Sequence, residues 1–389
     1  MGSVTSIITL LLTLLIGGVL GVSLLLGFGG LIWYGHQRLQ AQLAVLRTVT
    51  EGFGGHFEPR SFRRHASGRI PTDDGTTTVT FFQTRDESSI AFTDIEVPIP
   101  ICVPSVHLTP ETALSGVSKA LGGQDIELGD PALDHAFVIR GISEEVRGLL
   151  SPEICSQIAR LRDLHSSRHL ELALEPVRGG SGMLLRVRKK EWLTDEDLLR
   201  TYISVATELA SAVRERHLAP WRAASEALGL TLTEEPRKLT LSGSVHGVRV
   251  QATLELSAKQ RWLTRIYAET RGPPGLRLVH VDHGEGASIR LADPVLGMMV
   301  HVSGEEPAAV SALLQSAELT ETLLPIVHGY PGSTVTEDTV TLVSRERLWG
   351  RLTERVEQVA RLAAQVSQRQ AAGSAQALRA RQASTGKVK

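Results

Sequence analysis

The side chains with the clearest chemical potential form a short histidine-rich cluster in the second half of the chain. His280, Asp282 and His283 stand close together, and His301 follows them. Imidazole nitrogens and carboxylate oxygens are suitable zinc ligands, and residues 280 and 282 would project from one face of a strand. The preferred interpretation is a turn with polar tips, because the sequence does not place a further ligand nearby. The alternative is a metal site formed by His280, Asp282 and His283 and, with it, a metal-dependent hydrolase.

A second group of polar residues belongs to an Asp-Pro phrase. Asp130 is followed by Pro131, and Asp134 comes four positions after Asp130. Two carboxylates can share acid–base chemistry, but an Asp before Pro also fixes a turn by accepting hydrogen bonds from nearby backbone N–H groups. The turn is the preferred interpretation. No catalytic residue is assigned, and no cofactor is expected.

The Asp-Pro phrase occurs twice, which indicates an internal repeat. Residues 129–141 (GDPALDHAFVIRG) align without gaps with residues 292–304 (ADPVLGMMVHVSG), and four of the 13 positions are identical. Glu58-Pro59 is matched by Glu235-Pro236, and Leu149-Leu150 by Leu313-Leu314, in the same order. The sequence therefore predicts a duplicated domain.

The expected elements agree with two α+β domains. Each copy begins with a helix, at residues 38–49 and 221–228, and continues with short strands rich in β-branched residues. Helices are expected at 144–164 and 308–327, followed by hairpins and a closing amphipathic helix in each copy. The predicted domains are residues 38–216 and 217–368, which we call the first and second copy, and residues 369–389 form a disordered basic tail.

The phrase at residues 130–137, Asp-Pro-x-Leu-Asp-x-x-Phe, resembles one found in a loose group of uncharacterised bacterial single-pass membrane proteins. The second copy departs from it, with Gly297 in place of the second Asp and Val300 in place of Phe. The resemblance implies a strand-rich domain on a membrane anchor. The group has no established activity, so it supplies no catalytic residue.

The N-terminus predicts that anchor. The first 37 of the 389 residues contain no Lys, Arg, Asp or Glu, and residues 7–34 exceed the about 20 residues that a bilayer core requires. The expected fold is one N-terminal transmembrane helix (residues 1–37) followed by the two α+β domains. Trp33, Tyr34 and Arg38 would lie at the membrane interface. Gly17 and Gly21 form a small-xxx-small pair that predicts a homodimer.

The charge distribution predicts the orientation of the chain in the membrane and the partners of the domains. Arginines follow the span and none precede it, which predicts an outside N-terminus and cytoplasmic domains at the cell membrane. Residues 1–64 carry a charge of +3 and residues 369–389 of +5, which leaves −9 on residues 65–368. This negative charge on residues 65–368 argues against nucleic acid as a partner. The expected function is a membrane-anchored binding or scaffolding protein with the lipid bilayer and a protein as partners.

Overall fold

The computed structural model describes most of the chain. The described residues are 33–34, 36–59, 65–84, 90–111, 126–164, 169–177, 180–256, 262–286, 288–291, 293–345, 347–348 and 350–385. By its internal contacts the chain divides into two compact units. The first consists of Met1–Pro98, Ala159–Leu172 and Leu185–Glu208, and the second of Ile99–Ile158, Ala173–Leu184 and Leu209–Lys389.

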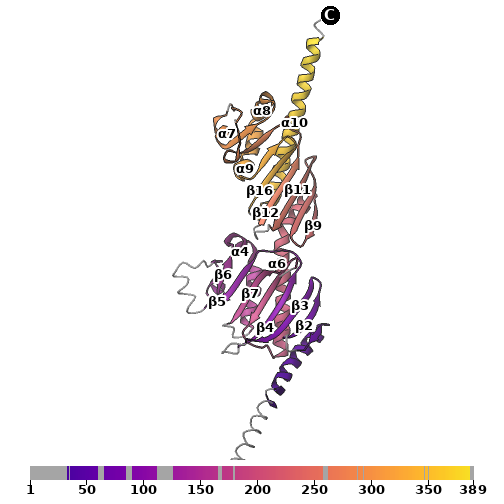
Figure 1. Cartoon of the computed structure of the whole chain (residues 1–389), viewed down its shortest axis with the longest axis vertical. Coiled ribbons are helices and arrows are strands. Elements are labelled where there is room, and N and C mark those ends of the chain that lie inside the picture. Colours follow the sequence, from indigo (N-terminus) through magenta and orange to yellow (C-terminus); the bar gives the residue numbers. More distant parts are fainter. Residues whose placement is uncertain are drawn as a thin grey trace, which may run out of the picture. The chain divides into compact units, whose positions relative to one another are not determined.

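The described strands form two eight-stranded antiparallel sheets (Figure 1). The first sheet contains β1 (His56–Glu58), β2 (Ala66–Thr72), β3 (Gly75–Gln83), β4 (Ala91–Ile99), β5 (Val106–Pro110), β6 (Phe137–Gly141), β7 (Leu170–Pro176) and β8 (Met183–Lys189). The second contains β9 (Thr231–Glu235), β10 (Lys238–Val245), β11 (Val248–Leu256), β12 (Trp262–Glu269), β13 (Arg277–His280), β14 (Val300–Ser303), β15 (Thr334–Thr336) and β16 (Thr339–Ser344).

The two sheets have the same topology. The first runs β6-β5-β7-β8-β4-β3-β2-β1, and the second runs β14-β13-β15-β16-β12-β11-β10-β9, so each strand has its counterpart at the same place. The close approaches are repeated too. A Cβ at Gly141 would come within 2.6 Å of Val146 Cγ2, and one at Gly304 within 2.8 Å of Val310 Cγ2. The predicted internal repeat is confirmed.

The helices follow the same repeat. Their bounds are α3 (Pro131–Asp134), α4 (Ser143–Leu149), α5 (Pro152–Asp163) and α6 (Glu196–Leu228), then α7 (Pro294–Met299), α8 (Pro307–Leu314), α9 (Ala317–Val327) and α10 (Leu352–Thr385). Residues 36–52 are also helical. The single helices expected at 144–164 and 308–327 are wrong, because each is two helices. Pro152 starts α5, and the Ser316 side chain caps α9 by accepting from Leu319 N–H.

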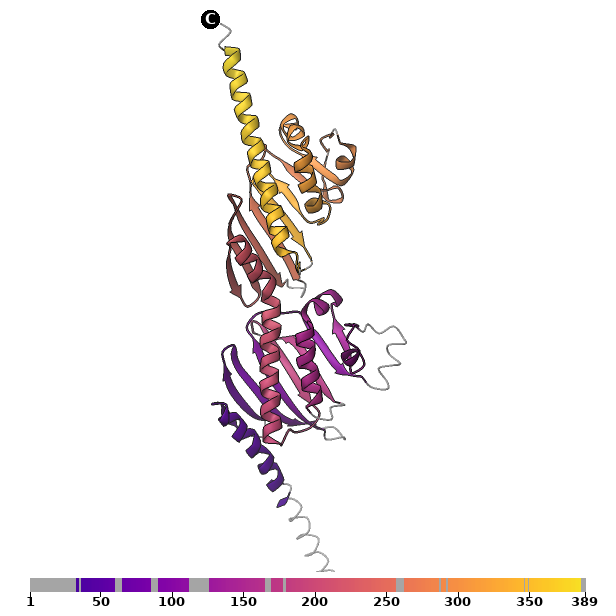
Figure 2. The ribbon, with the colours of Figure 1, turned by 180° about the vertical axis from the view of Figure 1, so that it is seen from behind.

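Each sheet has one face covered by helices. Buried residues alternate along β8 and β12, as expected for strands with one face in the core. Figure 2 shows α10 along one face of the second sheet, and α10 contacts β11, β12 and β16. On the opposite face of the first sheet the charges are paired. Arg188 donates to both carboxylate oxygens of Asp94 at 2.8 Å, and Arg186 donates to Glu96.

Helix α6 continues through the predicted domain boundary. The sequence predicts a new helix at residue 221, but α6 runs without interruption from Glu196 to Leu228 with Pro220 inside it. The reason is its buried face, which continues past the boundary through Val213, His217, Trp221 and Ala224 at helical spacing. Burial of this face outweighs the local cost of the proline. The domain bounds themselves stay a prediction.

The predictions for the two ends of the chain are corrected. The predicted fold class is corrected at its first element, since among the described residues no helix has the length and the apolar character to cross a membrane. Most of the predicted span, residues 1–32 and 35, lies outside the described residues. At the other end, residues 369–385 belong to α10, although a disordered tail is predicted there. Alanine and arginine are strong helix formers, so these residues extend the helix that precedes them.

Candidate functional site

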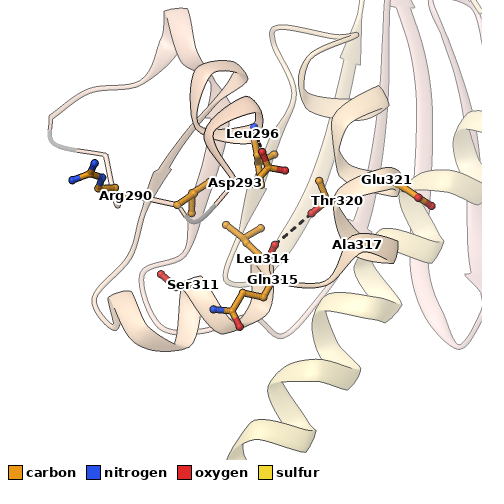
Figure 3. A pocket seen from close by; sticks show the side chains of 10 residues that line it. Arg290, Asp293, Leu296, Ser311, Leu314, Gln315, Ala317, Thr320 and Glu321 are labelled. Atoms are coloured by element: carbon orange, nitrogen blue, oxygen red, sulfur yellow. Dashed lines mark hydrogen bonds between the residues drawn. The ribbon is translucent and has the colours of Figure 1, made fainter.

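An open groove of about 820 Å³ lies in the helical layer of the second copy (Figure 3). Its walls come from the loop before α7, from α7 itself, and from the facing parts of α8 and α9. The floor is apolar, with the buried side chains of Leu296 and Leu314. The rim is polar and is formed by Arg290, Asp293, Ser311, Gln315, Thr320 and Glu321. The groove thus combines an apolar base with hydrogen-bonding groups, which is typical of binding sites.

The Asp-Pro phrase builds one wall of this groove. Asp293 Oδ1 accepts hydrogen bonds from Val295 N–H at 2.8 Å and from Leu296 N–H at 3.2 Å, so it caps α7. Pro294 occupies the first turn, where its missing N–H costs nothing. This cap directs Leu296 into the floor. The predicted structural role of the phrase is confirmed in both copies, because Asp130 accepts from Ala132 and Leu133 N–H in the same way.

The opposite wall is held by the junction between α8 and α9. Thr320 Oγ1 donates to the carbonyl oxygen of Leu314 at 3.4 Å, which joins the end of α8 to the first turn of α9. Figure 3 places Arg290 and Glu321 on opposite sides of the groove. A bound molecule therefore meets a cation at one end and an anion at the other.

In the first copy, a long side chain stands at the corresponding place. Position 290 aligns with Glu127 and position 311 with Arg147. Arg147 Nε donates to the carbonyl oxygen of Glu127 at 3.3 Å, so this long side chain reaches from α4 to the loop before α3. Ser311 is too short to do so. The groove of the second copy thus lies where the duplicated sites differ by an Arg-to-Ser exchange.

The exposed side chains of α7 differ from their counterparts in the first copy. Val295 is 48% exposed and Met298 is 68% exposed. The aligned residues of the first copy, Ala132 and His135, are exposed as well, but one is small and the other polar. Contiguous exposed apolar side chains often mark an interaction surface, and Val295 and Met298 are neighbours one helical turn apart.

The predicted metal residues lie elsewhere in the second copy, and they do not share a strand. His280 ends β13, and Val281–His283 form a short 3-10 turn, so the expected strand geometry of residues 280 and 282 is wrong. His280 Nδ1 lies 3.4 Å from Asp282 Oδ2, but the Asp282 side chain is 78% exposed. His283 and His328 place their ring centroids 6.2 and 5.4 Å from that of His280.

His301 and His280 lie on opposite faces of the second sheet. His301 pairs with Val279 across β13 and β14, whereas His280 pairs with Val300, so the two imidazoles leave the sheet on opposite faces. Among the described residues, no three His, Cys, Asp or Glu side chains converge in a way that could hold a metal ion. Metal binding by His280, Asp282 and His283 stays a prediction.

Sequence reasoning missed a buried cation in the second unit. Arg347 and His217 are both buried, and Arg347 Nη2 lies 3.0 Å from His217 Nε2. The guanidinium carbon of Arg347 stands 4.0 Å above the centroid of the Trp262 ring, a cation–π contact. Burial lowers the pKa of Arg347 to about 9, against the attraction of Glu145 and Cys102. Burial, and then the charge of Arg347, hold the pKa of His217 well below its usual value.

The structure describes only some of the residues that are predicted to lie in or near the membrane. Trp33, Tyr34 and Arg38 are exposed at the start of the N-terminal helix. Gly17 and Gly21 lie outside the described residues. Contacts with lipid and the N-terminal homodimer therefore stay predictions.

Comparisons with protein-family models, with curated proteins and with solved structures found no match for this chain. The resemblance of the Asp-Pro phrase to membrane proteins stays a prediction, and the groove is interpreted from its own geometry.

Proposed function

We propose that this protein is a binding module whose second copy holds a segment of a partner protein in the groove between α7, α8 and α9. The observation that carries the proposal is the difference between the copies. Both copies have the same topology. In the first copy Arg147 reaches the neighbouring loop, whereas the aligned residue in the second copy is the short Ser311, which lines the groove.

The composition of the groove supports a protein segment as the ligand. Leu296 and Leu314 offer an apolar base for one large side chain, while Gln315, Ser311 and Thr320 offer hydrogen-bonding groups to a polypeptide backbone. Val295 and Met298 are exposed apolar side chains on α7, the helix that also supplies Leu296. A buried anchor surrounded by a polar rim is the usual anatomy of a protein interface.

Substitution of Ser311 tests the proposal. The Ser311→Arg variant should place a guanidinium across the groove, as Arg147 does in the first copy, and should weaken peptide binding at least about tenfold. A random dodecapeptide library, displayed on phage and selected on the immobilised full chain, provides the ligands. Their affinities are then measured on wild type and variant by fluorescence anisotropy.

The repeat supplies a matched control. Arg147→Ser makes the reverse change in the first copy and should leave the selected peptides bound with unchanged affinity. If no peptides are enriched, or if the enriched peptides bind Ser311→Arg as tightly as wild type, the groove is not the binding site and the proposal fails.

The alternative, a metal-dependent hydrolase using His280, Asp282 and His283, has less support from the geometry. The side chain of Asp282 points into solvent, and a 3-10 turn separates its carboxylate from the strand that the site was expected to use. The binding role is therefore the one that we put forward.

A further inference from the structure

We infer that the partner segment brings a carboxylate into the groove, where it takes the place that Asp134 occupies in the first copy, next to a large apolar side chain. This inference rests on the proposed function and specifies the chemistry of the partner: an Asp or Glu adjacent to an apolar residue.

The first copy shows what a carboxylate does at this place. Asp134 Oδ1 accepts a hydrogen bond from Leu128 N–H at 2.9 Å, and Asp134 Oδ2 accepts one from Gly129 N–H at 3.0 Å. The charge of Asp134 thus satisfies two consecutive backbone donors in the loop before α3. Hydrogen bonds to an ionised acceptor are among the stronger ones in proteins.

The second copy lacks this carboxylate. Gly297 aligns with Asp134, and Leu291, which lines the groove, aligns with Leu128. A Cβ built at Gly297 would meet no atom within 4 Å, so the space next to this glycine is open. An acidic group from outside has room to approach the N–H of Leu291 from that side.

The local charge favours such a group. Arg290 stands where the first copy has Glu127, so this position has changed from acidic to basic. Two acids also line the groove. Asp293 already accepts two backbone hydrogen bonds at the start of α7, and Glu321 lies on the far side from Arg290. The acidic end of a bound segment is therefore directed toward Arg290 and away from Glu321.

The neighbouring surface selects the second feature of the segment. Leu296 lies in the floor, while Val295 and Met298 are exposed on α7. A large apolar side chain next to the carboxylate would cover these residues and remove them from water. The combination of an acid and an apolar residue follows from these two adjoining surfaces.

Methionine methyl signals can report this binding directly. The chain has four Met residues, of which Met298 is 68% exposed on α7 and Met183 is 1% exposed in β8. The full chain, labelled with 13C at the methionine methyls, is titrated with acetyl-Ala-Asp-Leu-Leu-Ala-amide and with the same peptide carrying Asn in place of Asp. The Asp peptide should shift the Met298 signal with a Kd about tenfold lower than the Asn peptide, and the Met183 signal should stay in place.

Three variants separate the carboxylate from other causes. Gly297→Asp supplies the acid within the chain and should abolish the preference for the Asp peptide. Gly297→Ala, which also removes the glycine but adds no acid, should retain that preference. Arg290→Gln should reduce it about tenfold, to near equality.

The outcomes also distinguish the inference from the proposed function. If both peptides shift Met298 with equal Kd, or if neither does while library-selected peptides bind in a Ser311-dependent way, the groove binds segments but the carboxylate inference is wrong. If the selected peptides do not depend on Ser311, the proposed function itself fails.

Discussion

Lowering the pH from 7 to 5 is expected to reduce the free energy of unfolding by about 2 kcal/mol through His217 alone. The pKa of His217 is held well below its usual value by burial and by Arg347, so the folded state keeps this ring neutral. The unfolded state takes up a proton near pH 6.5. Stability is therefore complete above that pH and is lost as the pH falls through the window below it.

The measurement is urea unfolding at several pH values between 5 and 8, on wild type and on a variant that lacks both His217 and Arg347. His217 and Arg347 are replaced together, by Phe and Met, because loss of His217 alone would remove a partner of the buried guanidinium. Replacing a buried polar pair with apolar side chains of similar size is often neutral or stabilising, so the variant should match wild type at pH 7.

The double variant should lose most of the acid sensitivity between pH 6.5 and 5. Substituting Gln for His107, an exposed residue of β5, provides the control and should preserve the wild-type slope. Equal slopes in wild type and in the double variant would show that His217 does not carry this effect.

The repeat and most strands could be predicted because their signals are local. Strand β11 (Val248–Leu256) is an example, since alternating apolar residues between turn signals specify a strand with one buried face. The gapless match between residues 129–141 and 292–304 likewise anticipated two copies of one topology. A strand pattern depends on neighbours in sequence, and a repeat depends on the similarity of two segments. Both can therefore be recognised without the structure.

Helix interruptions were harder to predict, because apolar spacing continues through them. Leu149, Leu150 and Ile154 are all buried, and this spacing favours one long helix at 144–164. The signal that decides the matter is Pro152, which suits a first helical turn and cannot continue a helix from before it. The same break before Ala317 follows from the Ser316 cap.

The buried cation and the groove could not be predicted from local patterns. His217 and Arg347 are 130 positions apart, so only the fold brings their side chains together. The groove depends on a difference between the copies, Arg147 against Ser311 and Asp134 against Gly297. Alignment of the copies contains that signal, but its meaning requires knowing that Arg147 reaches the carbonyl of Glu127.

Replacing Trp221 with alanine is expected to cost about 3–5 kcal/mol of unfolding free energy, the largest effect of any substitution considered. Trp221 is the largest fully buried side chain among the described residues, and it lies on α6 one residue after Pro220. Truncation removes its apolar burial and leaves a cavity that the close-packed surroundings cannot fill.

The position of Trp221 explains why this loss should be so large. Pro220 lacks the N–H that would bond to the preceding turn, so the helix is locally weak at the point where Trp221 holds it to the core. Denaturant unfolding of the full chain measures the effect, with Val295→Ala as a surface control expected to change stability by no more than about 0.5 kcal/mol. A loss below about 1 kcal/mol for Trp221→Ala would mean that packing of α6 after the proline does not depend on this ring.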